Sequence, residues 1–272
     1  IRNNGRRRDK QLWTENEEGE MPLYYYRAEE EEDEALYVTH TINDLVQQGY
    51  SFSDFAVLMR INALTRAYEQ EFSKYNVPYK VFGGFRFYER KEIKDLLAYL
   101  RIVNNPFDSE AVTRVINVPK RGIGAKTVET LEEYARREEL SVYDAVLNID
   151  ELPLNAGSKQ KVRAFGSLLK ELVVKGAEMS ADELVRDVIN DTDILSMYAD
   201  DSDESINKKA NIDEFVNSVD EFCRMNKGAT LADFLNQVTL SSDTDDMDAP
   251  DYVTLATVHS VEGLEFKVVF VV

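Results

Sequence analysis

Tyr252 to Val272 read YVTLATVHSVEGLEFKVVFVV, and this stretch decides the fold class. Its first part alternates β-forming side chains, and residues 268–272 are an unbroken apolar run. The alternation predicts a strand, and the apolar run predicts a second strand that is buried on both faces of a parallel sheet. The polar segment from His259 to Glu265 lies between them. Because ligands of open α/β sheets bind at the carboxyl ends of strands, this segment is predicted to face a ligand.

Strand and helix patterns alternate nearer the start of the chain. Residues 22–27 are a short β-rich run, and apolar residues recur at helical spacing from 35 to 46. Residues 54–60 and 78–82 have the pattern of buried strands, and Asn62 is a candidate N-cap of the helix between them. This order predicts a doubly wound parallel sheet of the α/β class.

Residues 93–240 have a different pattern. Apolar side chains recur there at helical spacing, and no strand pattern interrupts them. We therefore predict a separate all-α domain that is inserted into the sheet domain.

Composition excludes several classes of protein. One cysteine excludes a disulfide framework, and two histidines without a Cys/His cluster make a metal site unexpected. No signal peptide or apolar run near eighteen residues occurs, so we expect a soluble, cytoplasmic protein without membrane contact.

The charge is unevenly distributed. A net charge of −19 argues against a general nucleic-acid coat. The segment from Arg86 to Lys126 nevertheless contains nine basic and five acidic residues. This excess predicts a positive footprint on one face, although solvated helix faces would give the same count.

A second motif, KRGIGAKT, lies at residues 120–127. Its glycines predict a tight turn with free backbone N–H groups, and a new helix is expected from about Ala125. Free N–H groups, a helix N-terminus and nearby cations form a phosphate cradle of the helix-hairpin-helix type, which grips a duplex backbone without reading bases. The alternative is an ordinary helix–helix turn with a glycine cap. The predicted DNA-binding residues are Lys120, Arg121, Gly122, Ile123, Gly124, Lys126 and Thr127.

Four segments resemble superfamily 1 DNA helicases of the UvrD/PcrA/Rep type. Residues 257–270, T-x-H-S-x-x-G-L-E-F-x-V-V-F, resemble motif V, and AVLMRINA at 56–63 resembles motif IV. Residues 85–95 resemble the segment that leads into the helical insert of that family, and residues 117–124 resemble its N-V-P-x-R-G-I-G turn. The resemblance covers nearly the whole chain and is faint from about residue 150 to 240.

The resemblance implies roles for individual residues. Arg60 would be an arginine finger on the nucleotide γ-phosphate, both catalytic and nucleotide-binding. Gly263 and Glu265 would face the nucleotide, with the carboxylate near the ribose hydroxyls. Thr257 and His259 would contact single-stranded DNA.

Two positions depart from the family pattern. Met59 stands where the family often has a tyrosine that stacks on adenine. Glu262 stands where a lysine usually precedes the glycine of motif V. We expect the first change to affect base stacking and the second to weaken coupling.

The resemblance also implies a domain plan. Residues 1–20 would be a linker from an N-terminal motor domain, residues 21–85 and 250–272 a RecA-like domain called 2A, and residues 86–249 the inserted domain 2B. The sequence contains no G-x-x-x-x-G-K-[ST] and no Walker B pair. We therefore expect a fragment, truncated within the RecA-like domain.

The parent of such a fragment would be an ATP-dependent 3′-to-5′ DNA helicase of repair or replication. Its ATP and Mg²⁺ would be bound mainly by the domain outside this chain, and the fragment alone would bind neither and hydrolyse no ATP. Single-stranded DNA would lie on 2A and duplex on 2B. Three alternatives are a DNA-binding module without a motor, an acidic protein-interaction scaffold, and a helicase subunit of an AddA/RecB-type helicase-nuclease.

Overall fold

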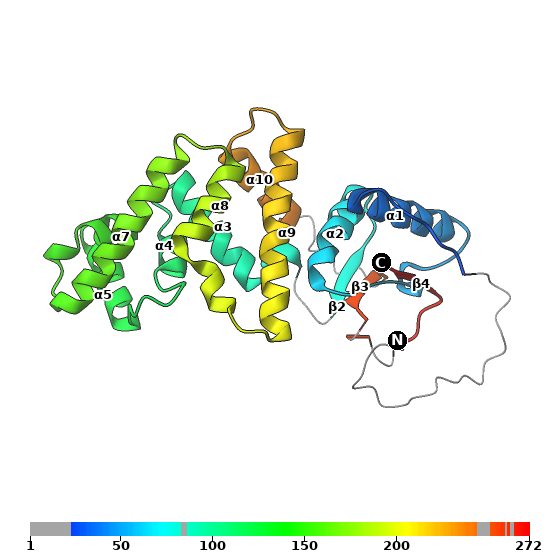
Figure 1. Cartoon of the computed structure of the whole chain (residues 1–272), viewed down its shortest axis with the longest axis horizontal. Coiled ribbons are helices and arrows are strands. Elements are labelled where there is room, and N and C mark those ends of the chain that lie inside the picture. Colours follow the sequence, from blue (N-terminus) through cyan, green and yellow to red (C-terminus); the bar gives the residue numbers. More distant parts are fainter. Residues whose placement is uncertain (1–22, 83–85, 244–250, 259, 262–263) are drawn as a thin grey trace.

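The computed structural model describes residues 23–82, 86–258, 260–261 and 264–272, except 244–250. These residues form a sheet unit and a helical unit that lie side by side (Figure 1). The helical unit connects to the sheet unit after β2 and before β3, so the chain leaves the sheet and returns to it.

A four-stranded parallel sheet is the centre of the sheet unit. Its strands are β1 (Phe55–Met59), β2 (Tyr79–Phe82), β3 (Val253–Thr257) and β4 (Val268–Val271). Their order is β2-β3-β1-β4, so β3, from the far end of the chain, lies between the two strands that precede the helical unit. The carboxyl ends of β1 and β3 meet at one edge, with Met59 opposite Thr257.

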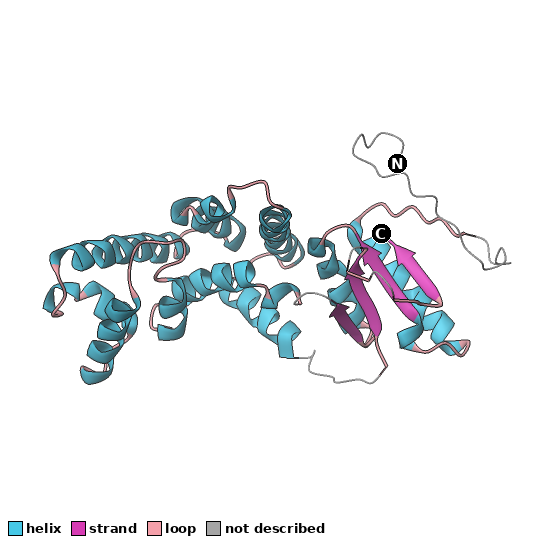
Figure 2. Ribbon diagram, turned by 90° about the horizontal axis from the view of Figure 1, so that it is seen from below, coloured by secondary structure: helices cyan, strands magenta, loops and turns pink. Residues whose placement is uncertain are grey.

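Two helices cover one face of this sheet, behind the strands in Figure 2. They are α1 (Glu31–Gln47) and α2 (Thr65–Lys74), with short 3₁₀ turns at Phe52–Asp54 and Asn62–Leu64 before β1 and α2. Apolar residues spaced three and four apart on both helices pack on alternate residues of the central strands. The α/β class with a parallel sheet is therefore confirmed.

Helices alone form the second unit between residues 87 and 243. Its buried core runs from Phe87 to Val238 and shares no residue with the core of the sheet unit. The helices are α3 (Lys91–Asn104), α4 (Ser109–Val115), α5 (Ala125–Arg137), α6 (Val142–Leu147), α7 (Ala156–Gly176), α8 (Ala181–Thr192), α9 (Asp203–Met225) and α10 (Leu231–Asp243), with 3₁₀ turns at Phe87–Glu89, Ile149–Glu151 and Ile194–Tyr198.

Three local predictions are wrong. β4 is an edge strand whose alternate side chains Val269 and Val271 are exposed, because they lie on the face of the sheet opposite to the one that α1 and α2 cover. Residues 23–28 pair with no strand of the described sheet. Asn62 does not cap α2, because a 3₁₀ turn intervenes and Leu64 occupies the N-cap position.

Candidate nucleotide and nucleic-acid interfaces

The carboxyl edge of the sheet brings two of the predicted site residues together. Arg60 follows β1 directly and is exposed, and Thr257 ends the neighbouring strand. The parallel pairing continues past both strands, because the backbone N–H of Val258 donates to the carbonyl oxygen of Met59 at 3.1 Å. An exposed guanidinium and a hydroxyl at one edge suit phosphate-bearing ligands.

Met59 contributes to the sheet core and not to this edge. Its side chain is fully buried among the residues that α1 and α2 cover. A methionine there stabilises the unit by burial and presents no surface to a base. The expected effect of this departure on base stacking stays a prediction.

The hydroxyl of Thr257 already has a partner in Ser260. Their hydroxyl oxygens lie 3.0 Å apart, and the Ser260 hydroxyl donates to the Thr257 carbonyl oxygen at 2.8 Å. Since Ser260 uses its hydrogen on that carbonyl, the Thr257 hydroxyl is left to donate to Ser260. Thr257 can therefore donate to a phosphate only after this internal hydrogen bond breaks. Ser260 belongs to the segment that resembles motif V, but no role was predicted for it.

The segment between β3 and β4 is described in part. His259, Glu262 and Gly263 lie outside the described residues, so their predicted roles stay predictions. Glu265 is exposed. It lies on the crossing that returns from the carboxyl edge to the start of β4, where Lys267 pairs with Asp54 at 2.9 Å.

The turn at Gly122–Gly124 connects two helices of the helical unit. Gly122 adopts a φ of +69°, which favours glycine, and Gly124 is the N-cap of α5. In the described part of the chain, the backbone N–H groups of Gly122, Gly124 and Ala125 have no acceptor. Lys120 and Lys126 are exposed beside them. The turn therefore offers N–H groups, a helix N-terminus and cations to an anion.

Two of the N–H groups expected to be free are occupied. The Asn117 side-chain oxygen accepts from the backbone N–H of Arg121 at 2.8 Å and of Ile123 at 3.3 Å. The Ile123 side chain is buried in the core, and Thr127 is buried as well. Asn117 therefore shapes the turn, and the N–H group of Ile123 is unavailable unless that bond breaks.

Arg121 points inward. Its guanidinium lies 5.1 Å from the centre of the Phe165 ring. It also donates hydrogen bonds to the carbonyl oxygens of Val115, Val118 and Pro119 and to the hydroxyl of Tyr99. These contacts indicate that Arg121 holds the turn against the core, and its predicted DNA contact stays untested.

Lys161 of α7 adds a cation that was not predicted from the sequence. Its ammonium nitrogen donates to the carbonyl oxygen of Gly122 at 3.0 Å, and the side chain is exposed. A Cβ atom on Gly122 would lie 2.9 Å from that nitrogen, so the glycine allows this approach. The two residues are 39 positions apart, and no local pattern could have predicted the contact.

The predicted positive footprint is smaller than the sequence count suggested. Arg101 pairs with Asp108, and Arg114 pairs with the buried Asp95, both at 2.8 Å. Arg90 is buried beside Glu69. Because these charges are neutralised internally, the footprint that remains comes mainly from exposed lysines of the segment, among them Lys120 and Lys126 beside the Gly122–Gly124 turn.

The described residues contain neither a cluster of metal ligands nor a membrane-spanning helix. Among the described residues, no three His, Cys, Asp or Glu side chains converge as metal ligands would. No helix in that part of the chain is both long and apolar enough to cross a membrane.

The two units define a class of protein: a RecA-like parallel sheet interrupted by a helical insert. The sequence matches the family of UvrD-like helicase C-terminal domains over residues 1–272, and the chain belongs to that family. It is 38% identical over 279 residues to the ATP-dependent DNA helicase PcrA of Bacillus subtilis, covering 99% of this chain and 38% of that protein.

Two further relatives carry the same name. The Staphylococcus epidermidis protein is 37% identical over 274 residues, and the Staphylococcus aureus protein is 38% identical over 274 residues. Each match covers 100% of this chain and 37% of the relative. The chain therefore spans little more than a third of the length of these relatives.

Proposed function

We propose that this chain supplies the second RecA-like domain and the duplex-contacting insert of an ATP-dependent DNA helicase that translocates 3′ to 5′ in repair or replication. The observation that carries the proposal is the family match over residues 1–272, together with relatives named ATP-dependent DNA helicases. In this proposal residues 21–85 and 250–272 form domain 2A and residues 86–249 form domain 2B. The parent protein would act in the cytoplasm, where its DNA substrate lies.

Duplex DNA is proposed to bind at the Gly122–Gly124 turn. The N–H groups of Gly124 and Ala125 would donate to a backbone phosphate, with Lys120 and Lys126 beside it. Such contacts fix the duplex without reading its sequence, which suits an enzyme that must act on any sequence.

Single-stranded DNA is proposed to cross the carboxyl edge of the sheet. Thr257 would exchange its hydrogen bond with Ser260 for one to a phosphate, and His259 would lie next to it. This exchange of one hydrogen bond for another costs little net free energy, so the strand can be held and released repeatedly.

The nucleotide is proposed to lie between this chain and a domain outside it. Arg60 would place its guanidinium on the γ-phosphate, where negative charge develops during hydrolysis. Gly263 and Glu265 would contact the ribose side. Mg²⁺ would be held mainly by the other domain and by the nucleotide phosphates.

Two assays on the isolated chain test the proposal. A fluorescently labelled tailed duplex is expected to bind more tightly than a single strand at low salt, because the duplex grip is intact. Mg-ATP with single-stranded DNA is expected to show no turnover. No preference for the duplex, or turnover above background, would contradict the corresponding assignment.

A further inference from the structure

A buried arginine joins the two units. Arg66 of α2 has only 5% of its surface exposed, and its Nε donates to Glu214 of α9. Its Nη1 donates to Glu221 of the same helix at 3.1 Å, and its Nη2 lies 3.9 Å from Glu32 of α1. One guanidinium therefore contacts carboxylates of both units at the same time.

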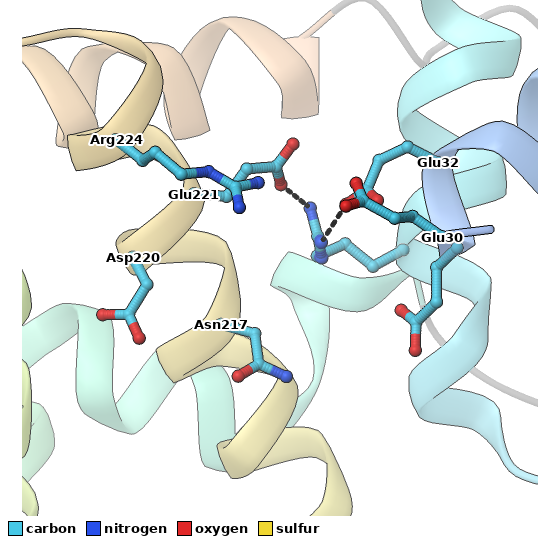
Figure 3. A pocket seen from close by; sticks show the side chains of 8 residues that line it. Glu30, Glu32, Asn217, Asp220, Glu221 and Arg224 are labelled. Carbon is cyan, nitrogen blue, oxygen red and sulfur yellow. Dashed lines mark hydrogen bonds and ion pairs between the residues drawn. The ribbon is translucent and has the colours of Figure 1, made fainter.

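The surroundings of Arg66 are strongly acidic. A cleft of about 360 Å³ opens here between the start of α1 and α9. Figure 3 shows Glu30 and Glu32 on one wall and Asp220, Glu221 and Arg224 on the other. Glu31, Arg66 and Asn217 complete the lining of the cleft.

Carboxylates thus outnumber cations across this junction. Burial, together with the nearby Glu214, raises the pKa of the Glu31 carboxyl, as expected where negative charges crowd. Without a cation between them, the acidic faces of α1 and α9 would repel one another.

The second buried arginine has a different position. Arg90 lies at the start of α3, within the chain connection between the units, and it donates to Thr65 of α2 at 2.6 Å and to Asn211 of α9 at 2.8 Å. Arg90 therefore secures the covalent connection. Arg66 lies beside this connection and differs from Arg90 in reaching carboxylates of both α1 and α9.

We propose that Arg66 is a positioning residue that fixes the helical unit on the sheet unit by neutralising the facing carboxylates of α1 and α9. It thereby sets where the Gly122–Gly124 turn lies relative to the carboxyl edge of the sheet. The consequence for DNA unwinding rests on the proposed function. The positional effect does not, and it can be measured without DNA.

The test is fluorescence energy transfer within single molecules of the 272-residue chain. Dyes are placed at Gln48→Cys on the sheet unit and Glu133→Cys on α5, both exposed, in a Cys223→Ala background. Gln48 directly follows α1, and α1 and α5 lie toward opposite ends of the molecule (Figure 1), so a change in the angle between the units alters the transfer efficiency.

Arg66→Gln is expected to shift and broaden the distribution of transfer efficiency at low salt. The matched control is Arg101→Gln, because Arg101 pairs with Asp108 and Glu110 within the helical unit and none of the three lines the cleft. This control is expected to leave the distribution unchanged.

Two further measurements, at high salt and with the opposing acids neutralised, distinguish an effect of charge from a simple loss of packing. Raising the salt from about 10 mM to about 1 M shortens the Debye length from roughly 30 Å to roughly 3 Å and should restore the Arg66→Gln distribution. Neutralising the opposing acids, with Glu32→Gln and Glu221→Gln added to Arg66→Gln, should restore it at low salt as well.

An Arg66→Gln distribution equal to that of the unsubstituted chain would overturn the proposal. A shift that neither salt nor neutralisation reverses would overturn its electrostatic basis. If Arg66→Gln does not fold, Arg66→Lys is measured instead; because lysine keeps the charge that neutralises the carboxylates, its distribution should stay close to that of the unsubstituted chain, and a shift that high salt does not reverse would be the contrary result. Failure of duplex binding by the unsubstituted chain would refute the proposed function and leave these outcomes unaffected.

Discussion

Arg121→Ala tests whether this arginine serves the fold or the ligand. The substitution removes hydrogen bonds to the carbonyl oxygens of Val115 and Val118 at 3.0 and 2.8 Å, one to Pro119 at 3.3 Å, and one to the Tyr99 hydroxyl at 2.8 Å. Each such bond contributes about 1 kcal/mol net. We therefore expect a loss of roughly 3 kcal/mol in the free energy of unfolding, since water can replace part of what is removed.

The assay is urea unfolding followed by helical circular dichroism, with the midpoint compared at constant slope. Lys120→Ala is the matched control, because the neighbouring side chain is exposed and its loss should change stability by less than about 0.5 kcal/mol. The two variants should also differ in duplex binding, because Lys120→Ala is expected to weaken the affinity for duplex DNA without changing the stability of the chain. The reasoning would be refuted if Arg121→Ala were as stable as Lys120→Ala.

Three further predictions concern stability. Gly122→Ala is expected to cost about 1–2 kcal/mol in thermal unfolding, because a φ of +69° disfavours a side chain. An unchanged melting temperature would contradict it. Gly176→Ala should cost about 1–3 kcal/mol, since its Cβ would lie 2.0 Å from a methyl of Val103, and no loss in urea unfolding would show that α3 and α7 can separate. Hydrogen bonds from neighbouring serines lower the pKa of the Asp200 carboxyl to about 2. The contribution of this carboxylate to the stability of the folded state should therefore be present above about pH 4 and lost as the pH falls toward 2. In Asp200→Asn this part of the acid dependence of the melting temperature should disappear, and an unaltered profile would argue against it.

The sheet was predictable where the pattern of side chains reflects burial directly. The alternation in residues 252–257 predicted β3, and the apolar run predicted that β4 exists. The burial of β4 was not predictable, because it depends on which elements lie beside the strand. The order of the strands was not predictable either, because β3 pairs with strands that lie about two hundred residues away in the sequence.

The turn at Gly122–Gly124 was predictable in outline and not in detail. Its glycines and the start of α5 follow from the local sequence. The role of Asn117 follows a known habit of short amide side chains, which accept backbone N–H groups of nearby turns, and could have been considered. Lys161 arrives through tertiary packing of α7 and leaves no local signal.

Arg66 shows the same limit most clearly. On its own helix it looks like a surface residue next to Ala67, and nothing nearby in sequence indicates burial. Its principal partner Glu214 is 148 positions away. Because a charged side chain is buried only where partners compensate its lost hydration, its position could be known only once α9 had been placed.

The central claim is that the helical unit grips duplex DNA through cations at the Gly122–Gly124 turn, and the salt dependence of binding tests it most directly. The affinity for a tailed duplex is measured by fluorescence anisotropy across a salt series, for the unsubstituted chain and for Lys120→Ala/Lys126→Ala/Lys161→Ala. If each lysine contacts one phosphate, the slope of log affinity against log salt should become shallower by about 0.9 per contact, or roughly 2.7 in all. Equal affinities and equal slopes for the two proteins would contradict the account.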